Sequence, residues 1–337
     1  MSAHDSRRKE RPVQFTVIMG RALIASMVAL VAPAVAQDFP SKPVTIIVPF
    51  AAGGAGDILA RILSPRLEKA FGKPFVVENR PGAGGVIGAV ATARAEPDGH
   101  TIMIAPSPTM AVNVTLFKKL PYDPVTDFVP LAMAAQTPFV LVVNPALPVK
   151  SVADLIKWVK DQKGKVSYAT AGPGVPHHLF AELLKSMTGI EMSPVPYKGS
   201  VPAITDVVAG HVPLMFVDLG PALGIIREGR VRPIGVSTAR RIPALPDVPP
   251  VNDTVPGFDV ASWQMVAAPA KTPRAIVDKL HTELKRELAT PELSGQIAKT
   301  GMLPMATTTV EGLQAFVKSE IARWGKVVHQ AGVAGSQ

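Results

Sequence analysis

The sequence contains no cysteine, and only 5% of its 337 residues are aromatic. The absence of cysteine excludes disulfides, cysteine-based zinc sites, iron–sulfur clusters and thiol nucleophiles. Charged residues are also few, at 18%, and they form neither a block of like charges nor a basic stripe interleaved with aromatic residues. The pattern typical of nucleic-acid binding is therefore missing, and we expect no nucleic-acid partner. The formal net charge of +9 is compatible with an anionic partner.

Familiar catalytic motifs are missing as well. The chain has no Gly-x-Ser-x-Gly elbow, no His-Glu-x-x-His pair and no Ser-x-x-Lys followed by the partner motifs of acyl enzymes. The adjacent His177 and His178 do not favour a metal site, because neighbouring residues at the start of a helix point in different directions. We therefore expect a protein that is not an enzyme and that holds neither a metal nor a cofactor.

The apolar content, 47% of the residues, is sufficient for about two full-sized domains. The first residues have a different role. A basic region precedes an apolar stretch at 22–32, and Ala34-Val35-Ala36 places small residues where a signal peptidase cleaves. A membrane anchor is the alternative, but this stretch is much shorter than the ~20 residues that a spanning helix needs. We expect a signal peptide over 1–36, cleaved after Ala36, and a periplasmic location.

After the signal, short β-rich runs alternate with stretches of helical periodicity, which predicts βαβ units and a mostly parallel sheet. Strands are expected at 44–50, 75–78 and 101–105, and then at 140–143, 166–170, 195–197, 214–217 and 234–237. Helices are expected at 57–71, 86–95, 152–160, 178–187, 203–209, 273–288 and 310–328, with Pro65 kinking the first of them or limiting its first turn. The fold class is α/β.

The order of these elements predicts two lobes. We assign 37–138 together with 264–337 to lobe 1 and 139–263 to lobe 2, with the chain crossing between them near 136–143 and 262–268. The two long helices at the end are expected to pack on lobe 1. Because open α/β sheets bind ligands at the carboxyl ends of their strands, a ligand cleft between the lobes follows.

Two glycine-rich corners follow strands and open helices. The first, 49–57, could turn backbone N–H groups toward an anion at the positive end of a helix dipole, although it matches neither a phosphate-binding loop nor a dinucleotide fingerprint. The alternative is a tight turn with Asp57 as N-cap. The second, 170–178, could close on the other side of the same anion. The similar turn at 79–85 is expected to be structural. Asp218 ends a strand and suits either a ligand contact or an ion pair with Lys198 or an arginine.

These turns also carry a resemblance. The sequence resembles the substrate-binding proteins of tripartite tricarboxylate transporters, the Bug (TctC-like) family, over essentially the whole chain after the signal. The motifs that carry it lie at 49–57 with 60–61, 77–85, 97–100, 196–199, 210–212 and 245–249. The resemblance implies a two-lobed periplasmic-binding-protein fold, type II like, that closes on a small carboxylate. A di- or tricarboxylate or an amino acid is implied, held largely by backbone groups and water and delivered to membrane permease subunits.

Carried over residue by residue, the resemblance implies a set of ligand-binding residues from both lobes: Phe50, Ala51, Gly53, Gly54, Ala171, Gly172, Gly174, Tyr197 and Asp218. Two departures from the family pattern concern this set. Val175-Pro176 stands where a hydroxyl residue is common, which favours a smaller or less polar ligand, and Asp218 lies one place later than usual. We expect a monomeric receptor. The alternatives are a periplasmic ligand sensor for a signalling partner and, less favoured, an α/β enzyme acting on a small organic acid.

Overall fold

A six-stranded sheet organises one half of the protein. The computed structural model describes residues 1–2 and 39–337, so the predicted cleavage site and all but the first two residues of the predicted signal peptide lie outside the described residues. The strand order of this sheet is β11-β4-β10-β3-β1-β2. The bounds are β1 (Val44–Val48), β2 (Phe75–Asn79), β3 (Thr101–Pro106), β4 (Phe128–Thr137), β10 (Ser262–Pro269) and β11 (Leu303–Pro304).

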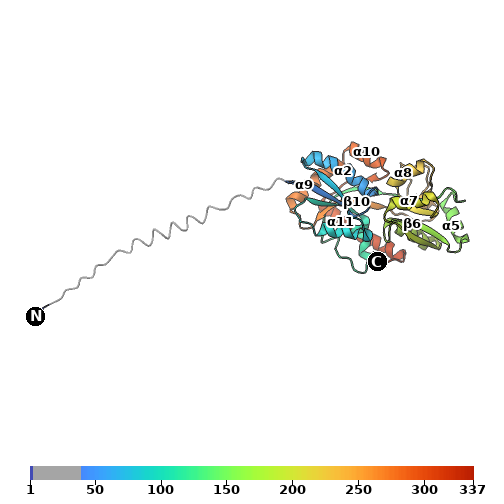
Figure 1. The fold of residues 1–337 in the computed structure, drawn as a ribbon, viewed down its shortest axis with the longest axis horizontal. Coiled ribbons are helices and arrows are strands. Elements are labelled where there is room, and N and C mark those ends of the chain that lie inside the picture. The colour runs from blue at the N-terminus through green and yellow to red at the C-terminus, as the bar shows by residue number, and fades with distance from the viewer. Residues whose placement is uncertain (3–38) are drawn as a thin grey trace. The chain divides into compact units, whose positions relative to one another are not determined.

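Two smaller sheets organise the other half, on the opposite side of Figure 1. One has the order β8-β5-β9 and the other pairs β6 with β7, while β6 also lies against β8. Their bounds are β5 (Phe139–Val143), β6 (Val166–Thr170), β7 (Met192–Pro196), β8 (Leu214–Asp218) and β9 (Arg232–Val236). The sheets thus draw their strands from the predicted lobes, although the exact lobe boundaries stay a prediction.

Strand direction is more mixed than the sequence indicates. The β1–β2, β1–β3 and β6–β7 pairs are parallel, as expected for βαβ units. The pairs of β10 with β3 and β4, and of β5 with β8 and β9, are antiparallel. The reason is the crossing of the chain, because β5 and β10 each enter their sheet directly from the other half.

The crossings themselves are shorter than predicted. Almost all of 136–143 and 262–268 is strand, because β4, β5 and β10 occupy these ranges. The first crossing is Pro138, between β4 and β5. The second lies just before Ser262, after the Val260 N–H has bonded to the Ser237 carbonyl in the second half. The chain passes from one half to the other through these two short connections.

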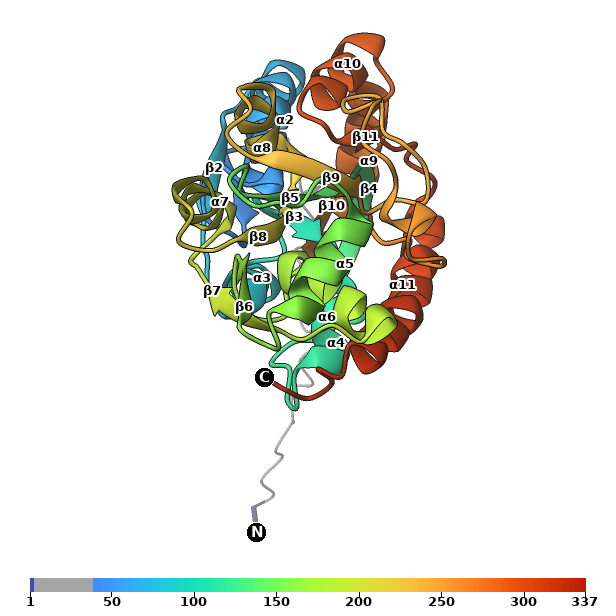
Figure 2. The same cartoon turned by 90° about the vertical axis from the view of Figure 1, so that its right-hand side faces the viewer.

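The helices cover the sheets on both faces (Figures 1 and 2). Helices α2, α9 and α10 bury an apolar stripe that includes Leu59, Leu63 and Leu280 against the first sheet. The helix that contains Pro65 runs from Ala55 to Phe71, so Pro65 does not limit its first turn, and the missing N–H of Pro65 leaves one i→i−4 bond unmade. The bounds are α2 (Ala55–Phe71), α3 (Val86–Ala93), α4 (Asn113–Leu116), α5 (Val152–Asp161), α6 (Pro176–Thr188), α7 (Ser200–Ala209), α8 (Leu219–Arg227), α9 (Arg274–Leu288), α10 (Pro291–Lys299) and α11 (Val310–Gln330), with short helices at Ala83–Gly85, Pro108–Val112 and Val251–Asp253.

Helix α11 packs on the first half, as expected, and it also contacts the second half. It lies against β4 of the first sheet and against α6 of the second half. The indole of Trp324 stacks on Phe180 at a centroid distance of 6.1 Å, and its Nε1–H donates to Glu320. Trp263 of β10 donates to the same carboxylate. One apolar core therefore runs through both halves, and Phe39–Gln337 is one compact unit.

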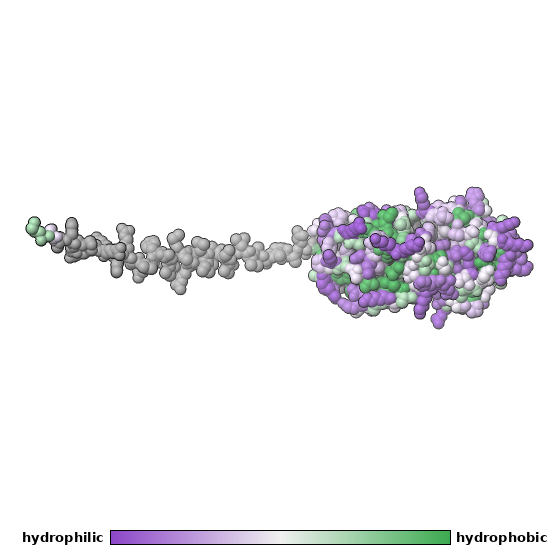
Figure 3. Space-filling view, turned by 90° about the horizontal axis from the view of Figure 1, so that it is seen from below, coloured by the Kyte–Doolittle hydropathy of each residue, from purple (hydrophilic) through white to green (hydrophobic). Residues whose placement is uncertain are grey.

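The surface of this unit is mixed. Figure 3 shows hydrophilic residues toward both ends of the body and hydrophobic residues gathered toward its middle. Within 39–337 the exposed large apolar side chains are Val76, Ile87, Val114, Val125 and Val201. Among the described residues, no helix combines the length and the apolar character that crossing a membrane requires.

Candidate ligand pocket

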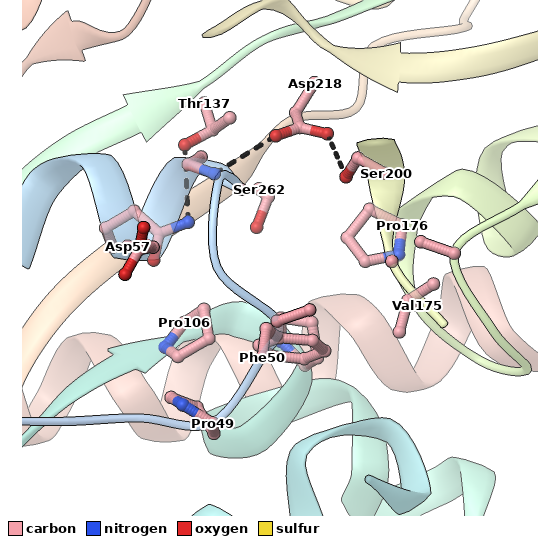
Figure 4. A pocket seen from close by; sticks show the side chains of 18 of the residues that line it. Pro49, Phe50, Asp57, Pro106, Thr137, Val175, Pro176, Ser200, Asp218 and Ser262 are labelled. Carbon is pink, nitrogen blue, oxygen red and sulfur yellow. Dashed lines mark hydrogen bonds between the residues drawn. The ribbon is translucent and has the colours of Figure 1, made fainter. Parts of the chain in front are cut away.

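A pocket lies where strands from both halves end (Figure 4). It encloses about 630 Å³ of space between atoms, part of which is open to solvent. The apolar lining comes from Val48, Pro49, Phe50, Ala51, Ala55, Ile104, Pro106, Pro108, Phe139, Ala171, Val175 and Pro176. The rest of the lining is Gly54, Gly56, Asp57, Thr137, His177, Gly199, Ser200, Asp218, Ser262 and Gln264. The site is thus apolar on one side and polar on the other.

In the first glycine corner, a backbone N–H group already bonds to a nearby carboxylate, that of Asp57. Helix α2 has Gly54 as its N-cap, so Asp57 is its third residue and not the predicted N-cap. The Asp57 carboxylate reaches back and accepts a 2.9 Å hydrogen bond from the Gly53 N–H. It also pairs with Arg61 at 3.0 Å. Burial alone would raise the pKa of Asp57, but these bonds outweigh it and hold the pKa below its ordinary value.

The position of Phe50 is set by a neighbouring turn. Asn79, at the end of β2, donates from Nδ2 to the Phe50 carbonyl at 3.0 Å. Figure 4 shows the Phe50 ring between Pro49 and Pro106 on one side and Val175 and Pro176 on the other. The turn after β2 is therefore structural, as the sequence indicates, and it acts on the pocket through Phe50.

Asp218 links the two halves at the pocket. Its carboxylate accepts a 2.6 Å hydrogen bond from the Ser200 hydroxyl and a 3.0 Å bond from His177 Nε2, both within the second half. Its other oxygen accepts from the Ala55 N–H, the first amide of α2, at 3.1 Å. Among the residues that the structure describes, neither Lys198 nor an arginine pairs with it. An acid of one half thus occupies the start of a helix in the other, where the helix dipole favours an anion.

The charge of Asp218 is stabilised despite its burial. Only 3% of the residue is exposed, and burial by itself raises the pKa of a carboxyl group. The hydrogen bonds from His177 and Ser200 outweigh this and hold the pKa of Asp218 below its ordinary value. Asp218 is therefore ionised at neutral pH.

The second glycine corner contributes less to the pocket than the sequence suggests. Ala171 lines it, whereas Gly172 and Gly174 do not. The Gly174 N–H donates to His178 Nδ1 at 3.0 Å, and the residue packs on Leu116 of the first half. The Tyr197 hydroxyl donates to Asp206, away from the pocket, and burial together with this bond raises the pKa of Tyr197 to about 12. Of the nine predicted residues, Phe50, Ala51, Gly54, Ala171 and Asp218 line the pocket, and Gly53, Gly172, Gly174 and Tyr197 do not.

Several lining residues escaped the sequence reasoning. Thr137, Ser262 and Gln264 come from β4 and β10, which were not predicted as strands. His177 and Ser200, in the first turns of α6 and α7, lie in segments that the sequence singled out but are not among the nine predicted ligand-binding residues. A polar glutamine inside the otherwise apolar run 263–268 was the available signal, because a buried polar side chain needs a partner.

Three lining residues have a buried polar atom without a partner among the described residues: Asp57 Oδ1, His177 Nδ1 and Gln264 Oε1. Such atoms are costly to bury unpaired, so they point to a ligand or water in the pocket. Within the part of the chain that the structure describes, no cluster of His, Asp and Glu could hold a metal ion.

The Ser200, His177 and Asp218 side chains do not form a hydrolytic triad. In such a triad the serine and the acid bond to different ring nitrogens of the histidine, so that a proton can pass from the serine. Here Ser200 Oγ and Asp218 Oδ1 both lie 3.0 Å from the same atom, His177 Nε2. The geometry holds a carboxylate in place and does not activate the serine.

Comparison with known proteins shows the family to which this chain is similar. The family described as "Tripartite tricarboxylate transporter family receptor" matches residues 59–333. A UPF0065 protein in the tcbD–tcbE intergenic region of Pseudomonas sp. (strain P51) is 39% identical over 292 residues, 86% of each chain. BugT of Bordetella pertussis is 35% identical over 305 residues, 90% of this chain and 93% of that one.

Solved structures agree with the fold. The R. palustris protein Rpa4515 with adipate is 38% identical, with a TM-score of 0.85 over 88% of this chain and 99% of its own. The periplasmic binding protein BugD is 34% identical, with a TM-score of 0.83 over 88% and 99%. MatC from Rhodopseudomonas palustris with bound malate is 33% identical, with a TM-score of 0.81 over 86% and 100%. The predicted α/β fold of two lobes, type II like, is confirmed.

Proposed function

The chain belongs to the family of tripartite tricarboxylate transporter receptors, and from this premise we propose that it captures a small carboxylate in the pocket between its halves. This proposal is supported above all by the position of the pocket, which is formed by strand ends of both halves. The Ala55 N–H donates a hydrogen bond to Asp218 across the two halves at this point. Proteins of the same fold that hold adipate and malate support the ligand class. Closure around the acid would exclude water from it.

The ligand contacts belong to the proposal. We infer that Phe50, Ala51, Gly54 and Ala171 contact the acid directly, together with Ser200 and Gln264. We infer that four other predicted residues support the lining without contacting the acid: Gly53, Gly172, Gly174 and Tyr197. The Gly53 and Gly174 N–H groups and the Tyr197 hydroxyl already bond to side chains of the protein.

Titration of the purified protein with a panel of carboxylates tests the ligand class. Calorimetry should give saturable binding of at least one acid, and mass spectrometry should find that acid released on unfolding of protein purified from cells. A protein that releases no ligand and binds no member of a panel of aliphatic, aromatic and amino acids contradicts the proposal. Replacing Phe50 by alanine should weaken binding about tenfold, since the ring contributes apolar contact worth more than ~1.4 kcal/mol.

The biological setting is also proposed. Members of the family include periplasmic binding proteins, and we infer that this chain is exported, cleaved after Ala36 and active as a monomer that delivers its ligand to the permease subunits of a transporter. It is proposed to be a receptor and not an enzyme, a view that the Ser200–His177–Asp218 geometry supports. N-terminal sequencing of the exported protein should start at Gln37.

A further inference from the structure

The lining of the pocket is short of positive charge. No lysine or arginine is among the described residues that line it, and its one basic side chain, His177, bonds through Nε2 to Asp218. Two acids line it instead, Asp57 with 4% and Asp218 with 3% of the residue exposed. A ligand that enters this pocket therefore meets two buried carboxylates, which are bonded to Arg61 and His177, and no lysine or arginine of the described lining.

Two backbone donors at the start of α2 are already in use. The Gly53 N–H bonds to Asp57 and the Ala55 N–H bonds to Asp218. The protein's own carboxylates thus take two of the positions at which this helix N-terminus would bind an anionic group of a ligand. A second carboxylate of a ligand, placed at either of these two positions, would have to displace Asp57 or Asp218 or lie beside it.

The unpartnered atoms in the pocket also favour a ligand that donates hydrogen bonds. Gln264 is 5% exposed, and its Oε1 has no partner among the described residues, although Nε2 lies 3.4 Å from Thr137 Oγ1. The Oε1 atom reaches over the first turn of α2, next to Gly56. Asp57 Oδ1 is a second buried acceptor without a partner in the described chain. An N–H or O–H of a ligand would satisfy such an acceptor.

We propose that this receptor selects acids with a single carboxylate whose opposite end is apolar or donates hydrogen bonds, and that Asp218 is the residue that rejects a second carboxylate. This inference rests on the proposed function, since it narrows the ligand class of the same pocket. The apolar side formed by Phe50, Val175 and Pro176 suits the body of such an acid.

Acids that share a skeleton and differ at one end test the proposal. Adipate, hexanoate and 6-aminohexanoate form one set, and terephthalate, benzoate and 4-aminobenzoate form another. In calorimetric titration at neutral pH, the members with one carboxylate should bind at least about tenfold more tightly than the dicarboxylate, a difference of about 1.4 kcal/mol. Equal or tighter binding of adipate and terephthalate overturns the inference and leaves the proposed function intact. Failure of every acid in the wider panel to bind overturns both.

Two variants assign the selection to residues. Asp218→Asn keeps the size of the side chain and an acceptor for the Ala55 N–H. It should reduce the difference in affinity between the acids with one and with two carboxylates to within about threefold, mainly through tighter binding of the dicarboxylate. Asp161→Asn removes an exposed acid outside the pocket and should leave the difference unchanged. A folded Asp218→Asn protein that still rejects adipate contradicts the role of Asp218.

A second variant keeps the proposal testable if Asp218→Asn fails to fold. Gln264→Met preserves the length of the side chain and removes its amide. It should weaken binding of 6-aminohexanoate about fivefold and leave hexanoate within about twofold, because only the first ligand donates a hydrogen bond at that end. Equal losses for both acids contradict the inference.

Discussion

At the scale of residues, the chemistry of the pocket depends on how buried acids are held. Asp57 and Asp218 are both ionised and buried, and each is stabilised by donors that the fold brings to it. A carboxylate that accepts several hydrogen bonds keeps its charge where an isolated one would take up a proton. The consequence is a pocket whose fixed charge is negative in a receptor for acids.

The pKa of Asp218 predicts a pH dependence of stability. Since its pKa in the folded state lies below 3.8, the unfolded chain binds more protons over the interval between the two values. The contribution of Asp218 is therefore complete above about pH 4 and is lost as the pH falls through the folded-state pKa. Denaturant unfolding should show Asp218→Asn less stable by about 1.5–3 kcal/mol at neutral pH, with the difference shrinking in acid.

The control for this prediction is Asp161→Asn, which should follow the wild type at every pH. A stability difference between wild type and Asp218→Asn that stays constant from neutral to acid pH would contradict the assigned role of the charge.

At the scale of elements, replacing a glycine near the start of a helix and replacing one at its end are expected to lower the stability of the protein by different amounts. Gly174, just before α6, has φ +70° and packs on Leu116 of α4, so a Cβ there would lie 1.8 Å from a Leu116 methyl carbon. Gly189, which ends the same helix, has φ +67° and nothing within 4 Å of such a Cβ. The two positions share the left-handed backbone and differ in the packing between the halves.

This pair predicts separable effects. Gly189→Ala should lower the free energy of unfolding by roughly 1–2 kcal/mol through backbone conformation alone. Gly174→Ala should cost an additional 1–3 kcal/mol or so from overpacking and should weaken carboxylate binding, since it pushes the corner away from the first half. Thermal unfolding and calorimetry check both effects. Equal losses of stability, with unchanged binding, would show that the Leu116 contact has no part in closing the pocket.

At the scale of the whole molecule, α11 couples the halves through Trp324. This residue is 1% exposed and stacks on Phe180 of α6, and Glu320 accepts hydrogen bonds from both Trp324 and Trp263. The arrangement joins the helix to β10, the strand that follows the second crossing. The halves therefore share a core in addition to the pocket.

A shared core predicts that the two halves unfold together. We expect the wild type to unfold in one calorimetric transition, and Trp324→Ala should lower stability by about 3–5 kcal/mol and split this transition into two, because it removes a large buried side chain at the junction. Trp158→Ala, in the half-buried Trp158 of α5, should lower stability by less and keep one transition. Retention of a single transition in Trp324→Ala would show that other contacts couple the halves.

The sequence alone predicted much of the local structure, because strand and helix patterns depend on neighbouring residues. The buried strand Val166–Thr170, the helix end at Phe71 and the glycine corners after strands all follow from short-range periodicity and turn chemistry. The family motifs, several of which lie at those corners, likewise indicate the fold and the role of a carboxylate receptor.

The tertiary structure alone decided which groups meet in the pocket. Asp218 bonds to Ala55 across 163 positions of the chain, and Gln264 reaches the start of α2 from a strand that enters antiparallel after a crossing. No local pattern encodes such contacts, because the closing of long loops and the pairing of distant strands set them. The same long-range packing uses the Gly53 and Gly174 amides inside the protein, which a reading of the glycines by themselves could not foresee.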